Sequence, residues 1–274
     1  QADGVFGLDR GDSYDQVGAV VDISDESVIR EYTPLTGGLR IGDKVRLDSY
    51  VFAVDPLQAH GIPFQEVSFS SPLGEFGAWS VEGSGDVWAI FVHGRTANRK
   101  EALRLLKTTA ELGLPSMVIT YQNDEGVAAS PSGYYEFGQT EWQDLEGAVK
   151  YALEHEADGV ILVGYSMGGA IVTSFLLESP SATAVSGVIL DAPMINFNAT
   201  VELGAREKGL PTALLALAKY VASLRFGVDW GKLDYLSRVE ELAVPILLFH
   251  GDEDDTVPIE TSEALAEARP DIVE

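Results

Sequence analysis

The chain has 274 residues, and 46% of them are hydrophobic, so one large α/β domain with an appendage can bury a sizeable core. Acidic residues outnumber basic ones by 43 to 18 and give a formal charge of -25, which disfavours nucleic acid and anionic membranes as partners and indicates an acidic, self-repelling surface. The absence of cysteine excludes disulfides, thiolate metal sites and a cysteine nucleophile, and no apolar run reaches the roughly 18 residues that a membrane helix needs.

The first sixty residues carry few chemical signals. Residues 17–33 alternate apolar and polar side chains around a Ser-Asp-Glu-Ser turn, which predicts a hairpin, and residues 44–54 predict a further strand. We therefore expect residues 1–60 to form a β-rich N-terminal appendage and residues 61–274 to form the main domain. At the start of that domain, residues 65–83 predict two strands joined by a Ser-Pro-Leu-Gly turn.

From Asp86 onward the pattern changes to short apolar strands that alternate with helices. The strands are predicted at residues 87–94, 115–121, 159–166, 185–193 and 244–251, and the helices at residues 98–113, 140–157, 167–179 and 260–268. Asn98 and Thr140 are suitable N-caps, because Glu101 and Gln143 stand three residues further on. The alternation predicts an α/β fold with a mostly parallel sheet and helices on both faces.

Residues 192–243 form an insertion between the last two strands. They include an Ala- and Leu-rich helical stretch at residues 212–227, at the edge of the sheet where ligands bind in such folds. We expect residues from about 194–240 to form a small helical lid over an acyl pocket. The alternative is an ordinary crossover helix with extra length.

The strongest chemical signal is the stretch "GYSMGG", in which Gly164, Ser166 and Gly168 match the pattern G-x-S-x-G. In this pattern the serine lies on a sharp strand-to-helix turn, and side chains two residues to either side would collide. An apolar strand precedes the stretch and a helix follows it, which is the context that the pattern requires. The sequence therefore predicts Ser166 as a nucleophile, with the alternative of a purely structural turn.

A second signal is the stretch "FVHGRTAN", which follows an earlier apolar strand. Acyl transfer needs two backbone N–H donors that stabilise the oxyanion of the tetrahedral intermediate. The residue after the nucleophile, Met167, supplies one, and the loop after the earlier strand supplies the other, which indicates Arg95. His93 is a weaker candidate for the catalytic base, because it precedes Ser166 and the order in this fold is serine, acid, histidine.

From about residue 62 to its end, the chain resembles the serine α/β-hydrolases. It is most similar to the group that includes monoacylglycerol lipases, lysophospholipases, depalmitoylating hydrolases and prolyl-oligopeptidase-like enzymes. The matching stretches are "FVHGRTAN", "ITYQNDEG", "TEWQDLEGAVKYAL", "GYSMGG", "VILDAP" and "VPILLFHGDEDDTVP". The resemblance implies the α/β-hydrolase fold and an acyl-transfer reaction, and it is weak for the substrate.

The appendage also resembles part of bacterial relatives, through the stretches "YTPLTGG" and "DKVRLDSYVFAVDP". Those relatives often carry a membrane anchor ahead of it. Because the chain begins at Gln1, we expect that its natural start has been lost and that a signal or anchor could have been lost with it. A cytoplasmic location and a membrane-anchored or extracytoplasmic location both stay open.

The resemblance also assigns the acid of the catalytic triad. In the family, His-Gly is followed by two residues, Asp, two residues and Val-Pro, which places the acid at Asp254. Its role is to orient a histidine and to stabilise the imidazolium that forms. We expect Asp252 and Asp255 only to cap the following helix. Asp191, which follows the preceding strand, is the second candidate for the acid.

The catalytic histidine is missing from this pattern. The chain has four histidines, His60, His93, His155 and His250, and none follows Asp254, whereas in relatives the catalytic histidine lies in a loop past the acid. Three interpretations are open: the sequence is a truncated portion of an enzyme, the histidine comes from a separate chain, or the protein is a non-catalytic descendant.

We favour truncation, because a site whose members act as a unit would not keep a strained elbow without function. The strand at residues 244–251 is apolar and suited to an interior position. We therefore expect exposed apolar surface and an unfilled place, or a second polypeptide, beside it. We also expect His93 and His250 to lie out of hydrogen-bond reach of Ser166.

Together these features predict a serine hydrolase that cleaves acyl esters through an acyl-enzyme and needs no metal or organic cofactor. The expected substrate is a small-molecule ester or a lipid-like ester, and the oligomeric state is not predicted. The alternative from another class is a binding or scaffold protein on a hydrolase fold. Within the enzyme class an aminopeptidase or a thioesterase stays open, because one triad serves all these acyl transfers.

Overall fold

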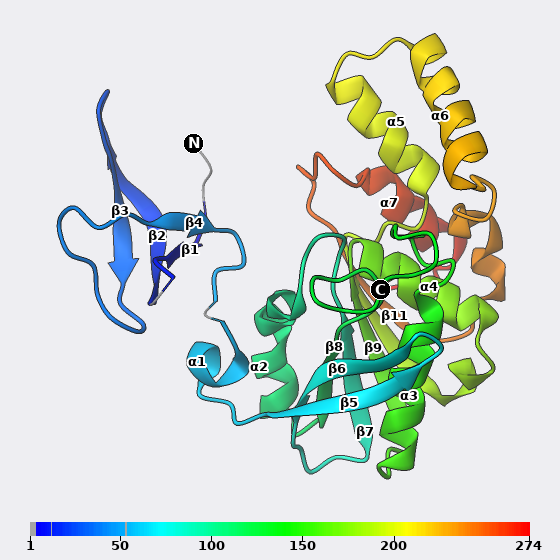
Figure 1. Cartoon of the computed structure of the whole chain (residues 1–274), viewed down its shortest axis with the longest axis horizontal. Helices are drawn as coiled ribbons and strands as arrows, with labels where there is room; N and C mark the ends of the chain where they lie inside the picture. Colours follow the sequence, from blue (N-terminus) through cyan, green and yellow to red (C-terminus); the bar gives the residue numbers. More distant parts are fainter. Residues whose placement is uncertain (1–3, 12, 53) are drawn as a thin grey trace.

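The computed structural model describes residues 4–11, 13–52 and 54–274 and contains two sheets (Figure 1). The N-terminal sheet, blue in Figure 1, is antiparallel and has the strand order β3-β2-β1-β4. Its strands are β1 (Phe6–Asp9), β2 (Tyr14–Ile23), β3 (Val28–Thr33) and β4 (Arg46–Asp48).

The hairpin predicted over residues 17–33 is confirmed, since β2 pairs with β3 from Val17↔Tyr32 to Ile23↔Val28. The strand predicted over residues 44–54 is wrong for most of its length. The chain turns after β4 because the Asp48 carboxylate accepts the N–H of Tyr50 at 3.0 Å. Val51 then takes a φ of 71°, and Ala53 lies outside the described residues.

The main sheet has the strand order β11-β10-β9-β7-β8-β6-β5. Its strands are β5 (Gln65–Ser71), β6 (Gly74–Val81), β7 (Val87–Val92), β8 (Ser116–Ile119), β9 (Gly159–Tyr165), β10 (Val185–Asp191) and β11 (Ile246–Phe249). The five strands from β7 to β11 pair in parallel, whereas β5 and β6 form an antiparallel hairpin at one side. The predicted mostly parallel sheet is confirmed.

Helices cover both faces of the main sheet. They are α1 (Pro56–His60), α2 (Leu103–Glu111), α3 (Trp142–Glu154), α4 (Met167–Glu178) and α7 (Ile259–Ala268), with the 3-10 turns η1 (Arg99–Ala102) and η2 (Pro180–Ala184). Alternate side chains of β7 point to opposite faces of the main sheet. Ile90 and Val92 are buried in the cluster that contains α3 and α4, and Ala89 and Phe91 are buried in the cluster that contains α2.

The two predicted helix caps have different outcomes. Asn98 caps η1, because its side chain accepts the N–H of Lys100 at 3.0 Å. Thr140 does not cap α3. Its hydroxyl accepts from Gln122 instead, and no side chain bonds the first turn of α3. A contact with a distant loop has therefore replaced the local cap.

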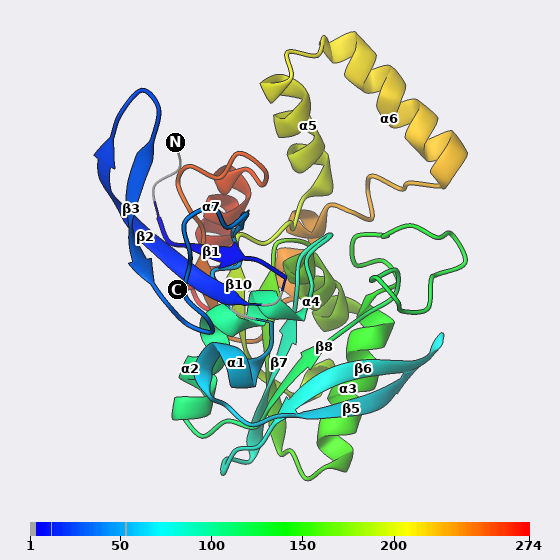
Figure 2. The same cartoon turned by 60° about the vertical axis from the view of Figure 1, so that its left-hand side comes forward.

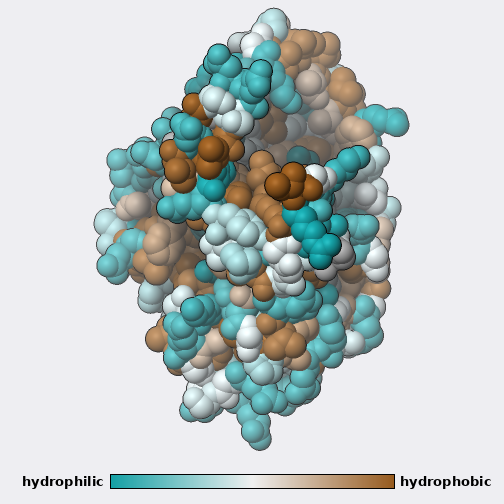
Figure 3. All heavy atoms as spheres, turned by 90° about the vertical axis from the view of Figure 1, so that its left-hand side faces the viewer, coloured by the Kyte–Doolittle hydropathy of each residue, from teal (hydrophilic) through white to brown (hydrophobic). Residues whose placement is uncertain are grey.

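The insertion before β11 contains α5 (Phe197–Glu207), α6 (Thr212–Phe226) and the 3-10 turn η3 (Tyr235–Glu241). The sequence predicted α6 only. In Figures 1 and 2, α5 and α6 stand beyond the end of the main sheet. No residue of α6 is buried, and in Figure 3 apolar spheres gather at the upper end of the molecule, where the other views place these helices. The insertion thus projects from the domain.

β11 lies at the side of the main sheet opposite the β5–β6 hairpin. Leu247 and Phe249 of this strand are 39% and 52% exposed, so the exposed apolar surface that the sequence predicts is present. The prediction of an unfilled place is wrong for the first part of the strand, because residues 272–274 pair with it. The N–H of Leu248 donates to Glu274 O at 2.8 Å, and the N–H of Glu274 donates to Ile246 O at 3.0 Å.

Among the described helices, none combines the length and the apolar character that crossing a membrane requires.

Candidate active site

Ser166 lies between the end of β9 and the start of α4. Its φ of 49° and ψ of -115° are unusual for a residue with a side chain. The N–H of Ser166 donates to Asp191 O, and its carbonyl accepts from Gly169 N and Met194 N, all at 2.9 Å. Backbone strain of this kind costs about 1–3 kcal/mol and persists only where the surroundings impose it. The turn has the form that a nucleophile elbow requires.

The two glycines of the pattern lie where other backbone segments come close. A Cβ on Gly168 would lie 2.1 Å from Val92 O, and a Cβ on Gly164 would lie 2.8 Å from Gly168 O. Both distances are shorter than any real Cβ contact. The first turn of α4 can therefore approach β7 and β9 only because these positions lack side chains.

The loop after β7 passes close to the serine. A Cβ on Gly94 would lie 3.1 Å from Ser166 Cβ. In the part of the chain that the structure describes, the backbone N–H groups of Arg95 and Met167 donate to no protein acceptor. Two unbonded N–H groups on the elbow and on this loop suit the oxyanion donors that the sequence predicts. Their assignment stays a prediction.

Charged side chains line the other side of this loop. The N–H of Gly94 donates to the Glu101 carboxylate at 2.6 Å. The Arg104 guanidinium lies 3.6 Å from Glu101 and 3.2 Å from Asp191, and it sits 4.7 Å above the ring of Tyr165. Asp191, the second candidate for the triad acid, is therefore held in an ion pair on the side of α2.

The Asp254 carboxylate shapes the loop after β11. One oxygen accepts the N–H groups of Thr256 and Val257, at 2.8 and 2.9 Å. The other oxygen lies 3.5 Å from His250 Nε2, which leaves it able to accept a stronger hydrogen bond. Asp254 thus stands on a well-defined turn at the end of the sheet where Ser166 also lies.

The two neighbouring acids do not have the role that the sequence predicted. Pro258 is the N-cap of α7, and no side chain bonds the first turn of that helix. The Asp255 carboxylate accepts from Thr256 Oγ1 at 3.1 Å. The expectation that Asp252 and Asp255 cap the helix is therefore wrong, because both precede the N-cap by at least three positions.

The two histidines nearest to the predicted site have partners of their own. His93 bonds the Asp124 carboxylate through Nε2 at 2.9 Å, and His250 bonds Ser262 Oγ through Nδ1 at 2.7 Å. Both side chains are buried. Within the described ranges, no hydrogen bond joins Ser166 Oγ to any histidine, as expected for His93 and His250.

The other two histidines bond backbone carbonyls. His60 Nε2 lies 2.8 Å from Leu103 O, where α1 meets α2. His155 Nδ1 lies 2.7 Å from Tyr151 O at the end of α3. None of the four histidines bridges the serine and the acid. No group of three or more His, Asp or Glu side chains in the described residues could hold a metal ion.

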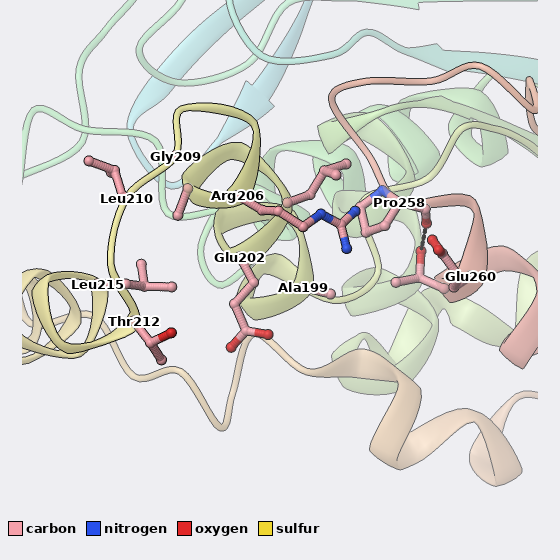
Figure 4. A pocket seen from close by; sticks show the side chains of 12 residues that line it. Ala199, Glu202, Arg206, Gly209, Leu210, Thr212, Leu215, Pro258 and Glu260 are labelled. Carbon is pink, nitrogen blue, oxygen red and sulfur yellow. Dashed lines mark hydrogen bonds between the residues drawn. The ribbon is translucent and has the colours of Figure 1, made fainter.

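A cavity of about 800 Å³ lies between α5, the start of α6 and the start of α7 (Figure 4). Its wall includes the apolar residues Leu203, Leu215 and Pro258, and the Arg206 side chain extends across it toward Pro258 (Figure 4). The insertion therefore lines a cavity, and its role as a lid over an acyl pocket stays a prediction. None of the four predicted site residues lines this cavity.

Comparisons with known proteins find one matching family and solved structures with a similar fold. The sequence profile of the family described as serine aminopeptidase, S33, matches residues 90–233, more than half of the chain. This segment includes the loop after β7, the turn at Ser166 and most of the insertion. The chain is also 23% identical over 184 residues to the uncharacterized protein YqkD of Bacillus subtilis (strain 168). The match covers 66% of this chain and 59% of YqkD, less than two thirds of that protein's length.

Solved structures share the fold at low identity. The esterase Pf2001 of Pyrococcus furiosus is 18% identical, with a TM-score of 0.62, and the match covers 81% of this chain and 83% of the esterase. The acylaminoacyl peptidase of Pyrococcus horikoshii is 17% identical, with a TM-score of 0.59, and the match covers 78% of this chain and 36% of the peptidase. These likenesses identify the fold as the α/β-hydrolase fold.

Proposed function

The chain belongs to the serine aminopeptidase S33 family of α/β-hydrolases, and we propose that it is a serine hydrolase that cleaves carboxylic esters through an acyl-enzyme. The observation that carries this proposal is the strained backbone of Ser166, at a φ of 49°, beside the unbonded N–H groups of Arg95 and Met167. A fold has no structural need for a strained serine with free donors around it, whereas acyl transfer needs both.

The reaction follows from these groups. Ser166 Oγ attacks the carbonyl carbon of the ester, and a general base takes its proton. The carbonyl oxygen becomes an oxyanion, which the N–H groups of Arg95 and Met167 stabilise. The intermediate collapses, the base returns the proton to the leaving alcohol, and the acyl group stays on Ser166. Water then attacks the acyl-enzyme by the same route and releases the acid.

The base is proposed to be a histidine from outside these 274 residues, because each of the four histidines present bonds another group. Asp254 would accept a hydrogen bond from that histidine and orient it. In this proposal α5 and α6 form the lid, and the acyl chain enters beside them. The substrate is a small-molecule or lipid-like ester.

Replacement of Ser166 tests the proposal. We expect Ser166→Ala, in the protein expressed from its complete gene, to lower the kcat for p-nitrophenyl esters by about 10⁴-fold or more without changing the circular dichroism spectrum. Ester turnover that survives this change would contradict the proposal. Aminoacyl p-nitroanilides serve as comparison substrates, because an aminopeptidase hydrolyses them, whereas the esterase proposal expects no appreciable turnover of them.

A further inference from the structure

The peptide group between Gly94 and Arg95 is held from one side by three contacts. Gly94 O accepts from Tyr121 Oη and from Ala97 N, both at 3.2 Å, and His93 Nδ1 lies 3.0 Å from it. In a planar trans peptide, the C=O of one residue and the N–H of the next point in opposite directions. The three contacts therefore fix the direction of the Arg95 N–H, which points away from Tyr121.

Among the described residues, Tyr121 donates through its hydroxyl only to carbonyls of this loop. Its side chain is fully buried, and its ring stacks on the His93 ring with centroids 4.4 Å apart. The hydroxyl donates to the carbonyls of His93 and Gly94, at 2.9 and 3.2 Å. Burial, and then the nearby Asp124 carboxylate, raise the pKa of this hydroxyl well above its usual value. The hydroxyl therefore keeps its proton and remains a donor.

Asp124 holds the other two members of the group. One carboxylate oxygen accepts from His93 Nε2 at 2.9 Å and from the backbone N–H of Tyr121 at 3.0 Å. The second oxygen accepts from the Tyr135 hydroxyl at 3.2 Å. The two ring nitrogens of His93 face Gly94 O and the Asp124 carboxylate, at 3.0 and 2.9 Å. The orientation of His93 is thus set by Asp124.

We propose that Tyr121, His93 and Asp124 are positioning residues that aim the Arg95 N–H at the oxyanion during ester cleavage. This inference rests on the proposed function. Within the described part of the chain, none of the hydrogen bonds of these three side chains reaches Ser166, so they act through the peptide group between Gly94 and Arg95.

The arrangement has a specific kinetic consequence. The Arg95 N–H meets a full negative charge only in the tetrahedral intermediate and the transition states around it. A misdirected donor therefore lowers kcat and leaves KM nearly unchanged. Complete loss of one such donor costs about 10²–10³-fold in kcat. Loss of one of the contacts that direct it should cost less, and we expect kcat to fall roughly tenfold to hundredfold.

Tyr121→Phe removes only the hydroxyl and keeps the stacked ring. Tyr235→Phe is the matched control, because Tyr235 is also buried and its hydroxyl also donates to a loop carbonyl, Phe137 O, at 2.9 Å. Thermal unfolding compares their stability, and p-nitrophenyl ester hydrolysis gives kcat and KM. A trifluoromethyl ketone, which forms a tetrahedral adduct with an active serine, reports the oxyanion contacts directly.

We expect the two variants to lose similar stability. Only Tyr121→Phe should lower kcat at constant KM, and it should weaken trifluoromethyl ketone binding by the same factor. Asp124→Asn is the second variant, and it should show the same pattern if Tyr121→Phe does not fold. An active enzyme in which Tyr121→Phe or Asp124→Asn keeps kcat and inhibitor affinity at the Tyr235→Phe level would overturn the inference. A wild-type protein that neither hydrolyses esters nor binds the ketone would overturn the proposed function instead.

Discussion

Gly168→Ala tests the packing that holds the serine elbow. The added Cβ would lie 2.1 Å from Val92 O and 2.8 Å from His93 O. Both atoms belong to the backbone at the end of β7, where Val92 pairs with Gly164 of β9, so moving Val92 O aside would disturb that pairing. Overpacking usually costs about 1–3 kcal/mol, and a clash with backbone lies at or above the upper end of that range. We therefore expect Gly168→Ala to lower the free energy of unfolding by about 3 kcal/mol or more.

A protein of this size loses roughly 2–4 °C in Tm for each kcal/mol, so Gly168→Ala should unfold about 6–12 °C below the wild type. Gly204→Ala is the matched control. Gly204 lies inside α5, and a Cβ there would meet nothing within 4 Å. Alanine favours a helix over glycine by up to about 1 kcal/mol, so this variant should match or exceed the wild type. Thermal unfolding followed by circular dichroism measures both, and a Gly168→Ala Tm equal to that of the wild type would refute the packing account.

Two further predictions concern carboxylates. Asp254→Asn should lower the kcat for esters far more than Asp252→Asn, because only Asp254 is proposed to orient the base. Equal decreases in kcat for the two variants would contradict the assignment of Asp254 as the triad acid. Burial raises the pKa of Asp48, but its bonds from Tyr50 N, Lys100 and Tyr14 outweigh burial and hold the pKa below the usual 3.8. Stability from this lowered pKa is present above pH 3.8 and is lost as the pH falls through the folded value. The amount by which Asp48→Asn lowers Tm at pH 7 should therefore shrink below about pH 4. A Tm difference between Asp48→Asn and the wild type that does not change with pH would contradict this prediction.

The parts of the fold that sequence could predict depend on local patterns. The strands of the main sheet are short apolar runs, and Ser166 stands out because its glycines, strand and helix adjoin in sequence. By contrast, Thr140 was expected to cap α3, and its hydroxyl instead accepts from Gln122. A local propensity was overridden there by a contact that only the folded chain creates.

The start of α5 has a sequence signal that could have predicted this helix. Asn196 accepts the N–H of Ala199 at 2.9 Å and caps α5, so an N-cap residue marked the helix that was missed. No comparable signal marked Tyr121, because its bond to Gly94 O joins residues 27 positions apart. The elbow was therefore predictable from adjacent residues, and the group that directs the Arg95 N–H required the tertiary structure.

If Ser166 is an activated nucleophile, a fluorophosphonate should label it in the protein from the complete gene, and peptide mass spectrometry locates the adduct. We expect one adduct, on the peptide that contains Ser166, and none in Ser166→Ala. A folded wild-type protein that stays unlabelled, or an adduct on another residue, would contradict the assignment of Ser166 as the nucleophile.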